Sequence, residues 1–106
     1  MGRLVIVAYA PKPGMVDSLL AAVRKHLQVL RTADLVTDRP AAVMRAADGT
    51  ILEVFEWRSA EAIARAHTTP AVQALWTEFA AACEYRPLSS LAECQQLFAE
   101  FDSIEL

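Results

Sequence analysis

Residues 53–68 of this chain read EVFEWRSAEAIARAHT and decide the fold. The first five of them form the end of a predicted buried strand, with Val54, Phe55 and Trp57 as its apolar residues, and the strand ends at Arg58. Ser59 is a residue type that accepts hydrogen bonds from the free amides at a helix start, and Glu61 in the first turn suits the helix dipole. The stretch therefore predicts a strand followed at once by a short helix that ends near Thr68.

A second helix is predicted directly after the first. Thr69 is in place to cap it, and Pro70 stands at its first position, where a missing N–H costs nothing. The apolar residues that follow recur at helical spacing and form one face: Val72, Leu75, Trp76, Phe79 and Cys83.

Beyond this helix the chain predicts two more elements. Residues 84–88 form a short fourth strand, which Pro87 confines to the edge of a sheet because proline cannot donate to a strand ladder. Residues 90–93, Ser-Leu-Ala-Glu, make a capping box that predicts a last helix through about Phe101.

The N-terminal half supplies the remaining strands and a long helix. Residues 3–10 are a nearly continuous apolar run, as expected of a strand covered on both faces. Residues 15–30 carry apolar side chains on one stripe of helical period. Residues 39–47 and 50–57 predict two strands, which Asp48-Gly49 joins as a two-residue type I′ turn.

These elements predict an α+β fold in a single domain over residues 1–106. Their order is β-α-β-β-α-β with an extra C-terminal helix, which is the ferredoxin-like arrangement around an antiparallel four-stranded sheet. The two-residue turn also fixes the strand faces. One face then carries Val43, Arg45, Leu52, Val54 and Glu56. The other carries Met44, Glu53, Phe55 and Trp57.

The composition of the chain argues against nucleic acid and membrane as partners and for a second copy of the chain. The net charge of −3 and a pI near 5.3 leave no basic stripe, so we expect no nucleic-acid partner. No apolar run approaches the length of a membrane span, and the N-terminal run is too short for a signal peptide, so we expect a cytoplasmic protein without membrane contact. Yet 55% of the residues are apolar and the mean hydropathy is +0.26. This surplus predicts a homodimer that shares apolar surface.

Three short motifs occur in a recognisable order: Lys12-Pro13-Gly14 between the first strand and its helix, Glu56-Trp57-Arg58-Ser59, and His67 to Pro70. In this order the chain resembles the antibiotic-biosynthesis-monooxygenase-like family over roughly residues 4–83. The resemblance implies a dimeric α+β barrel in which two four-stranded sheets face each other. Family members include cofactor-free oxygenases, haem-degrading enzymes, lactone isomerases and proteins without known activity, so the fold does not settle function.

The haem-degrading branch of the family uses an asparagine on the first strand, then a tryptophan and a histidine on the later helices, and this chain has other residues at those places. The corresponding positions hold about Val7, Ala66 and Trp76, none of which supplies an iron ligand. No histidine or cysteine pair has the spacing of metal ligands. We therefore expect neither a metal nor another cofactor.

Charged residues inside predicted strands are the first candidates for chemistry, because a covered charge is costly unless it is paired or hydrated. Arg45, Glu53 and Glu56 are of this kind. One interpretation is a polar wall in a small cavity, where a glutamate acts as a catalytic base. The other, which we favour, is an ion pair at a barrel mouth or a solvated rim at a dimer interface.

His67 ends the short helix where the family has its pocket mouth, and two roles remain open for it. It is either a general base, together with Glu53 or Glu56, or a residue that bonds the last carbonyls of its own helix. His26 lies at the edge of an apolar helix stripe and is predicted to be packed and hydrogen-bonded.

Aromatic residues are the candidates for ligand contact. Tyr9, Trp57, Trp76 and Tyr85 can line a flat aromatic ligand, with Arg45 as a polar contact, although Trp76 also fits a core position. Two functions follow. We favour a dimer that binds a small apolar or aromatic metabolite, and the alternative is a cofactor-independent monooxygenase or isomerase that acts on an aromatic or polyketide-like substrate.

Overall fold

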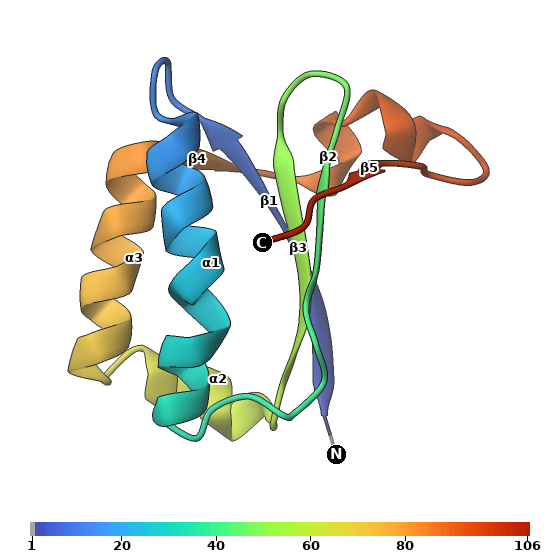
Figure 1. The fold of residues 1–106 in the computed structure, drawn as a ribbon. Helices are drawn as coiled ribbons and strands as arrows, with labels where there is room; N and C mark the ends of the chain where they lie inside the picture. The colour runs from blue at the N-terminus through green and yellow to red at the C-terminus, as the bar shows by residue number, and fades with distance from the viewer. Residues whose placement is uncertain (1) are drawn as a thin grey trace.

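The structure is a computed structural model that describes residues 2–106, and it consists of a sheet with helices on one face (Figure 1). The strands are β1 (Arg3–Pro11), β2 (Ala42–Arg45), β3 (Ile51–Trp57), β4 (Cys83–Arg86) and β5 (Asp102–Ser103). The helices are α1 (Val16–Thr32), α2 (Ala60–Ala66) and α3 (Pro70–Ala82). Over the part of the chain described, none of the helices has the length and apolar character needed to cross a membrane.

The sheet is antiparallel throughout, and its strands are ordered β4-β1-β3-β2-β5. Helix α1 connects β1 to β2, and α2 with α3 connects β3 to β4. The first four strands are thus compatible with the predicted ferredoxin-like α+β fold, and β4 lies at the predicted edge. The sheet has five strands rather than four, because Asp102 and Ser103 pair with β2.

The stretch that follows β3 folds as its sequence predicts. Ser59 precedes α2, and its Oγ accepts a hydrogen bond from the amide of Ala62 at 3.1 Å. Pro70 opens α3. Thr69 occupies the N-cap position but does not cap with its side chain, because its hydroxyl donates to the carbonyl of Arg65 at 2.8 Å. That bond ties the start of α3 to the end of α2.

The turn between β2 and β3 differs from the predicted type I′ turn. Arg45 pairs with Ile51, and the amide of Ala46 donates to the carbonyl of Thr50 at 2.8 Å, so the loop has three residues, 47–49. Only Gly49 in this loop has a positive φ, of 94°. This is a type I turn followed by a glycine bulge. The side chain of Asp48 favours it by accepting from the Thr50 amide at 2.8 Å.

One extra residue in the loop shifts the register by one, and that exchanges the faces of one strand relative to the other. Val43 pairs with Glu53, and Met44 pairs with Leu52. Arg45 therefore shares a face with Glu53, and not with Glu56 as predicted. The predicted division of polar side chains between the two faces was wrong for this reason.

Replacing Gly49 with valine is expected to lower the free energy of unfolding by about 1–3 kcal/mol, because a β-branched residue resists a positive φ. Nothing lies within 4 Å of the place where its Cβ would be, so the loss comes from the backbone alone. Ala47→Val, in the same loop at a residue without positive φ, is the matched control. Urea denaturation that gives the same midpoint for both variants would contradict this account of the turn.

The predicted C-terminal helix does not form. Residues 88–95 make two short 3-10 turns, Leu88–Ser90 and Ala92–Gln95, and the chain then continues without regular structure to β5. Leu91 is 2% exposed and packs in a small cluster with Ala8 and Leu52 on the sheet face opposite the helices. Most helical stability comes from packing an apolar face, and Leu97 and Phe98, which belong to that face, are exposed and not packed.

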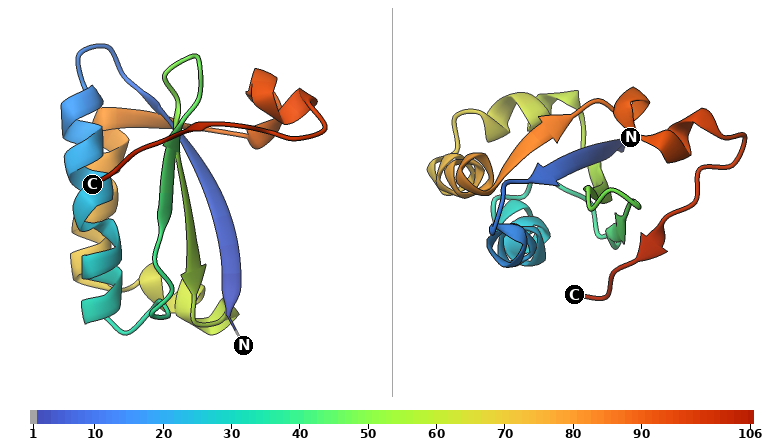
Figure 2. Two further views of the ribbon diagram at one scale, coloured as in Figure 1. Left: turned by 45° about the vertical axis from the view of Figure 1, so that its right-hand side comes forward. Right: turned by 90° about the horizontal axis from the view of Figure 1, so that it is seen from above.

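Residues 88–101, here called the C-terminal arm, extend away from the helices on the far side of the sheet (Figures 1 and 2). Leu97 and Phe98 in this arm are 94% and 77% exposed. The sheet face beside the arm is also uncovered at Leu4 and Ile6, which are 55% and 50% exposed. The helix-free side of the molecule thus presents apolar side chains to solvent.

Candidate functional site

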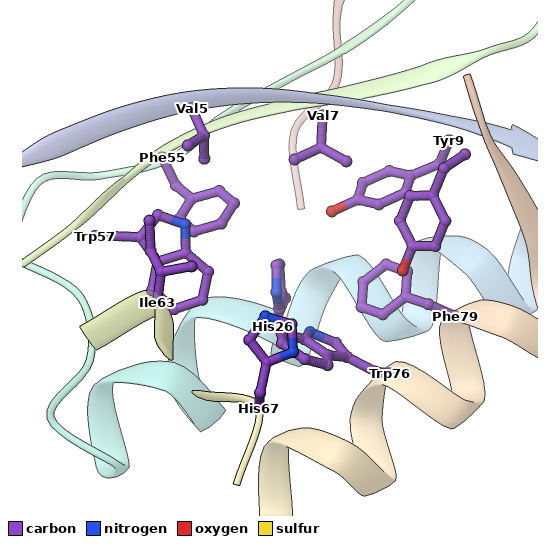
Figure 3. A pocket seen from close by; sticks show the side chains of 11 residues that line it. Val5, Val7, Tyr9, His26, Phe55, Trp57, Ile63, His67, Trp76 and Phe79 are labelled. Atoms are coloured by element: carbon purple, nitrogen blue, oxygen red, sulfur yellow. The ribbon is translucent and has the colours of Figure 1, made fainter. Parts of the chain in front are cut away.

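A cavity of about 410 Å³ lies between the sheet and the three helices (Figure 3). Alternate residues of a strand point to the same face, and the strands contribute Val5, Val7, Tyr9, Phe55, Trp57 and Tyr85. The helices and the loop after α2 contribute His26, Ile63, His67, Trp76 and Phe79. Six of these side chains are aromatic, so the cavity presents ring faces and edges to a ligand.

Glu53 is a buried carboxylate that bonds two residues of the cavity lining, Tyr9 and His26. Its side chain is 1% exposed, and one carboxylate oxygen, Oε1, takes part in two hydrogen bonds. The hydroxyl of Tyr9 donates to it at 2.8 Å, and Nδ1 of His26 lies 2.7 Å from it. Burial, and then the charge of the Glu53 carboxylate, raise the pKa of Tyr9 far above its ordinary value, so Tyr9 keeps its proton and remains a donor.

The contact with Glu53 determines the tautomer of His26. A carboxylate can only accept a hydrogen bond, so Nδ1 of His26 carries the hydrogen and Nε2 is left as the acceptor of the neutral ring. The ring is 4% exposed and is held edge-on by Phe55 and Phe79, each with its centroid 5.1 Å from that of His26. His26 is packed and hydrogen-bonded, as predicted.

Nε2 of His26 opens onto the cavity. No side chain of residues 2–106 forms a hydrogen bond with it, and the structure leaves no fully buried side-chain nitrogen or oxygen without a partner in that range. Nε2 must therefore be accessible, and the open space that His26 adjoins is the cavity. A small molecule in the cavity can reach Nε2, which is the proton-accepting nitrogen of the ring in its neutral form.

His67 lies at the rim of the same cavity. It is exposed, it forms the C-cap of α2, and its ring is edge-on to Trp76 with the centroids 5.0 Å apart. The structure shows no hydrogen bond between its side chain and Glu53 or Glu56. The predicted grouping of His67 with a glutamate is thus replaced by the pair of His26 and Glu53.

The predicted ligand contacts divide into those inside the cavity and those outside it. Tyr9, Trp57 and Trp76 line the cavity, and Trp57 is 7% exposed. Tyr85 lines it as well, and burial raises the pKa of its hydroxyl. Arg45 does not reach it: this residue is exposed on β2, opposite Asp102 of β5.

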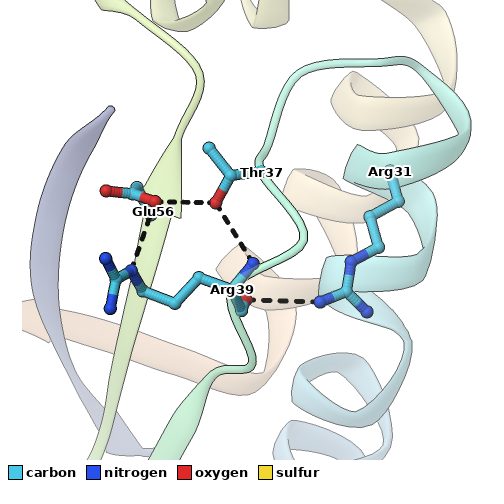
Figure 4. Close-up of polar contacts among 4 residues, drawn as sticks. All are labelled: Arg31, Thr37, Arg39 and Glu56. Carbon is cyan, nitrogen blue, oxygen red and sulfur yellow. Dashed lines mark hydrogen bonds and ion pairs between the residues drawn. The ribbon is translucent and has the colours of Figure 1, made fainter. Parts of the chain in front are cut away.

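Glu56 also lies outside the cavity, on the opposite face of the sheet (Figure 4). The hydroxyl of Thr37 donates to its Oε1 at 2.8 Å, and Nε of Arg39 donates to the same oxygen at 3.2 Å. The bond from Thr37, followed by that from Arg39, lowers the pKa of Glu56. Glu56 thus forms an ion pair with Arg39 outside the cavity.

The pairing of His26 with Glu53 was missed by sequence reasoning, although each residue interrupts an apolar pattern. His26 interrupts the apolar stripe of α1, and Glu53 interrupts the inward positions of β3. Two polar interruptions on facing layers indicate a buried pair, because each then satisfies the other. The predicted hairpin register suggested Arg45 as the partner of Glu56, so no partner for Glu53 was sought on helix α1.

Within residues 2–106, no three histidine, cysteine, aspartate or glutamate side chains form a group that could hold a metal ion. The side chains of the cavity can stack on a flat molecule, and His26 can exchange a proton with it. No protein-family model matches the chain, and neither a curated protein nor a solved structure matches it.

Proposed function

We propose that this protein binds a small, flat, apolar or aromatic molecule in the cavity between the sheet and the helices. The supporting observation is the lining itself, with six aromatic side chains around about 410 Å³. That volume falls within the range of about 300–1,000 Å³ usual for small-molecule sites, which are also mostly apolar with a few polar groups. Aromatic rings at van der Waals distance favour offset or edge-on contact with a ligand ring.

The ligand test uses the tryptophans as reporters. Both tryptophans of the chain, Trp57 and Trp76, line the cavity, so their fluorescence reports on its occupation. 4-Nitroanisole, a flat neutral arene whose nitro group quenches tryptophan, is expected to quench both in a saturable manner. Val7→Phe fills part of the cavity and should weaken binding at least about tenfold, equivalent to ~1.4 kcal/mol. Val16→Phe, at an exposed position at the start of α1 and outside the cavity, is the control. Linear quenching without saturation would contradict the proposal.

We further propose that a second copy of the chain covers the helix-free face of the sheet, giving the dimeric α+β barrel that the resemblance implies. Leu4 and Ile6 expose apolar surface there, and the C-terminal arm carries Leu97 and Phe98 on the same side of the molecule. An apolar face and an apolar arm on one chain suit a two-fold interface, in which each arm lies against the partner. Such a partner would account for the apolar surplus of the sequence.

The alternative function, a cofactor-independent monooxygenase or isomerase, needs a base inside the cavity. His26 is the residue that favours this alternative, because it combines an accessible ring nitrogen with a buried carboxylate partner.

A further inference from the structure

We propose that His26 is the proton acceptor of this cavity, and that the ligand is a flat aromatic molecule with a weakly acidic hydroxyl group, a phenol or an enol, which is held as its anion. The proposal rests on the ligand-binding function proposed above and adds the chemical class of the ligand. It follows from the way in which Glu53, Tyr9 and His26 are arranged.

The proton passes from the ligand hydroxyl to His26 inside the complex. The O–H bond of the ligand breaks, its electron pair stays on oxygen, and an N–H bond forms at Nε2 of His26. Nδ1 keeps its hydrogen toward Glu53 at 2.7 Å throughout. The imidazolium that results lies between a buried carboxylate and the bound oxyanion, and both stabilise its charge. No further reactant is needed.

Glu53 is a positioning residue in this scheme, since its bond to Nδ1 determines which nitrogen faces the ligand. Tyr9 holds the same carboxylate oxygen from the other side at 2.8 Å. The hydroxyl of Tyr9 cannot serve as the acceptor in place of His26, because its pKa is raised and it stays protonated. The two aromatic rings on His26, those of Phe55 and Phe79, keep the imidazole from turning away.

The charged groups around the cavity favour a ligand that is a weak acid over a ligand that is always an anion. The titratable groups that face it are Tyr9 from β1, His26 from α1, Tyr85 from β4 and His67 after α2, with Glu53 behind them. Among the described residues, no lysine or arginine lines it. A carboxylate or sulfonate ligand would thus be buried near Glu53 without a fixed cation. A phenol or enol brings its own proton and so creates its counter-ion on His26.

The test compares 4-nitrophenol with 4-nitroanisole, in which a methyl group replaces the acidic proton. The phenolate of 4-nitrophenol absorbs visible light, so its fraction is read directly in the bound state. At a pH below the solution pKa of the probe, we expect at least about ten times more phenolate relative to phenol in the complex than in free solution, a shift of about one pKa unit. A bound probe that titrates as it does in water would overturn the proposal. Failure of both probes to bind would instead refute the ligand-binding function.

His26→Asn removes the base and keeps an N–H that can donate to Glu53. We expect it to bind 4-nitroanisole and to lose the extra phenolate. Glu53→Gln should reduce the phenolate fraction while 4-nitroanisole still binds, and Glu56→Gln, on the other face, is its matched control. Extra phenolate that persists in His26→Asn and disappears in His67→Asn would place the base on His67 and refute the proposal.

A measurement on the unaltered protein does not depend on how the variants fold. With ¹⁵N-labelled histidine, saturation with 4-nitrophenol should move the Nε2 resonance of His26 to the protonated position, and 4-nitroanisole should not. An Nε2 resonance that stays unprotonated in the 4-nitrophenol complex would refute the proposal.

Discussion

Glu53→Leu is expected to lower the free energy of unfolding by about 2–5 kcal/mol, one of the two largest effects predicted here. Leucine has a similar volume, so the loss does not come from an empty space. It comes from the Tyr9 hydroxyl and the His26 Nδ1–H, which both lose their only acceptor in a buried place. Each such unsatisfied donor costs about 1–3 kcal/mol. Urea denaturation at a fixed protein concentration measures the change.

Two further variants test this explanation against a general intolerance of β3 to substitution. Glu56→Leu, three residues along the same strand, removes a surface ion pair and should cost far less. Tyr9→Phe should cost stability in the natural protein but restore part of it in Glu53→Leu, because there it removes an unpaired donor. Additive losses in the double variant would show that the hydroxyl and the carboxylate do not act as a pair.

Ile6→Lys is expected to dissociate the proposed dimer, raising its dissociation constant at least about a hundredfold, which corresponds to ~3 kcal/mol. Ile6 is 50% exposed in the single chain, so a lysine there reaches water and folding is tolerated. Against a second copy, the same ammonium group would be buried without a partner. Sedimentation over a range of protein concentrations measures the change, and circular dichroism verifies that the variant folds.

Val16→Lys is the matched control for this experiment, since Val16 is 40% exposed at the start of α1, away from the helix-free face. It should leave the dissociation constant as it is. If the protein without substitutions sediments as a stable folded monomer at micromolar concentration, the dimer is refuted, and the barrel with it. If Ile6→Lys and Val16→Lys change the dissociation constant equally, the interface does not lie on β1.

The candidate site was predicted in part. Tyr9, Trp57, Trp76 and His67 line the cavity as the sequence suggested, because the alternation of a strand and the position of a helix end are local properties. Arg45 and Glu56 do not, since Arg45 lies exposed on β2 beside β5 and Glu56 lies on the opposite face of the sheet. His26 was predicted to be packed and hydrogen-bonded, but its partner was not identified.

The local elements were determined by the sequence itself. The strand from Ile51 to Trp57, the cap at Ser59 and the proline start at Pro70 each depend on neighbours within a few residues, and all three lie where the pattern predicts them. Capping residues and apolar periodicity act over one or two turns of chain, so they need no tertiary contact to be interpreted.

Only the tertiary structure decided the rest. The capping box at residues 90–93 predicted a helix, but Leu91 packs on the sheet and Glu93 accepts from the amide of Ala47 at 2.8 Å instead. The pairing of His26 with Glu53 joins residues 27 positions apart on facing layers. At residues 90–93 these distant contacts outweigh the local preference for a helix, because burying the Leu91 side chain is worth more than one helical turn. His26 and Glu53 keep their predicted helix and strand, but only the packing of the two layers makes each the partner of the other.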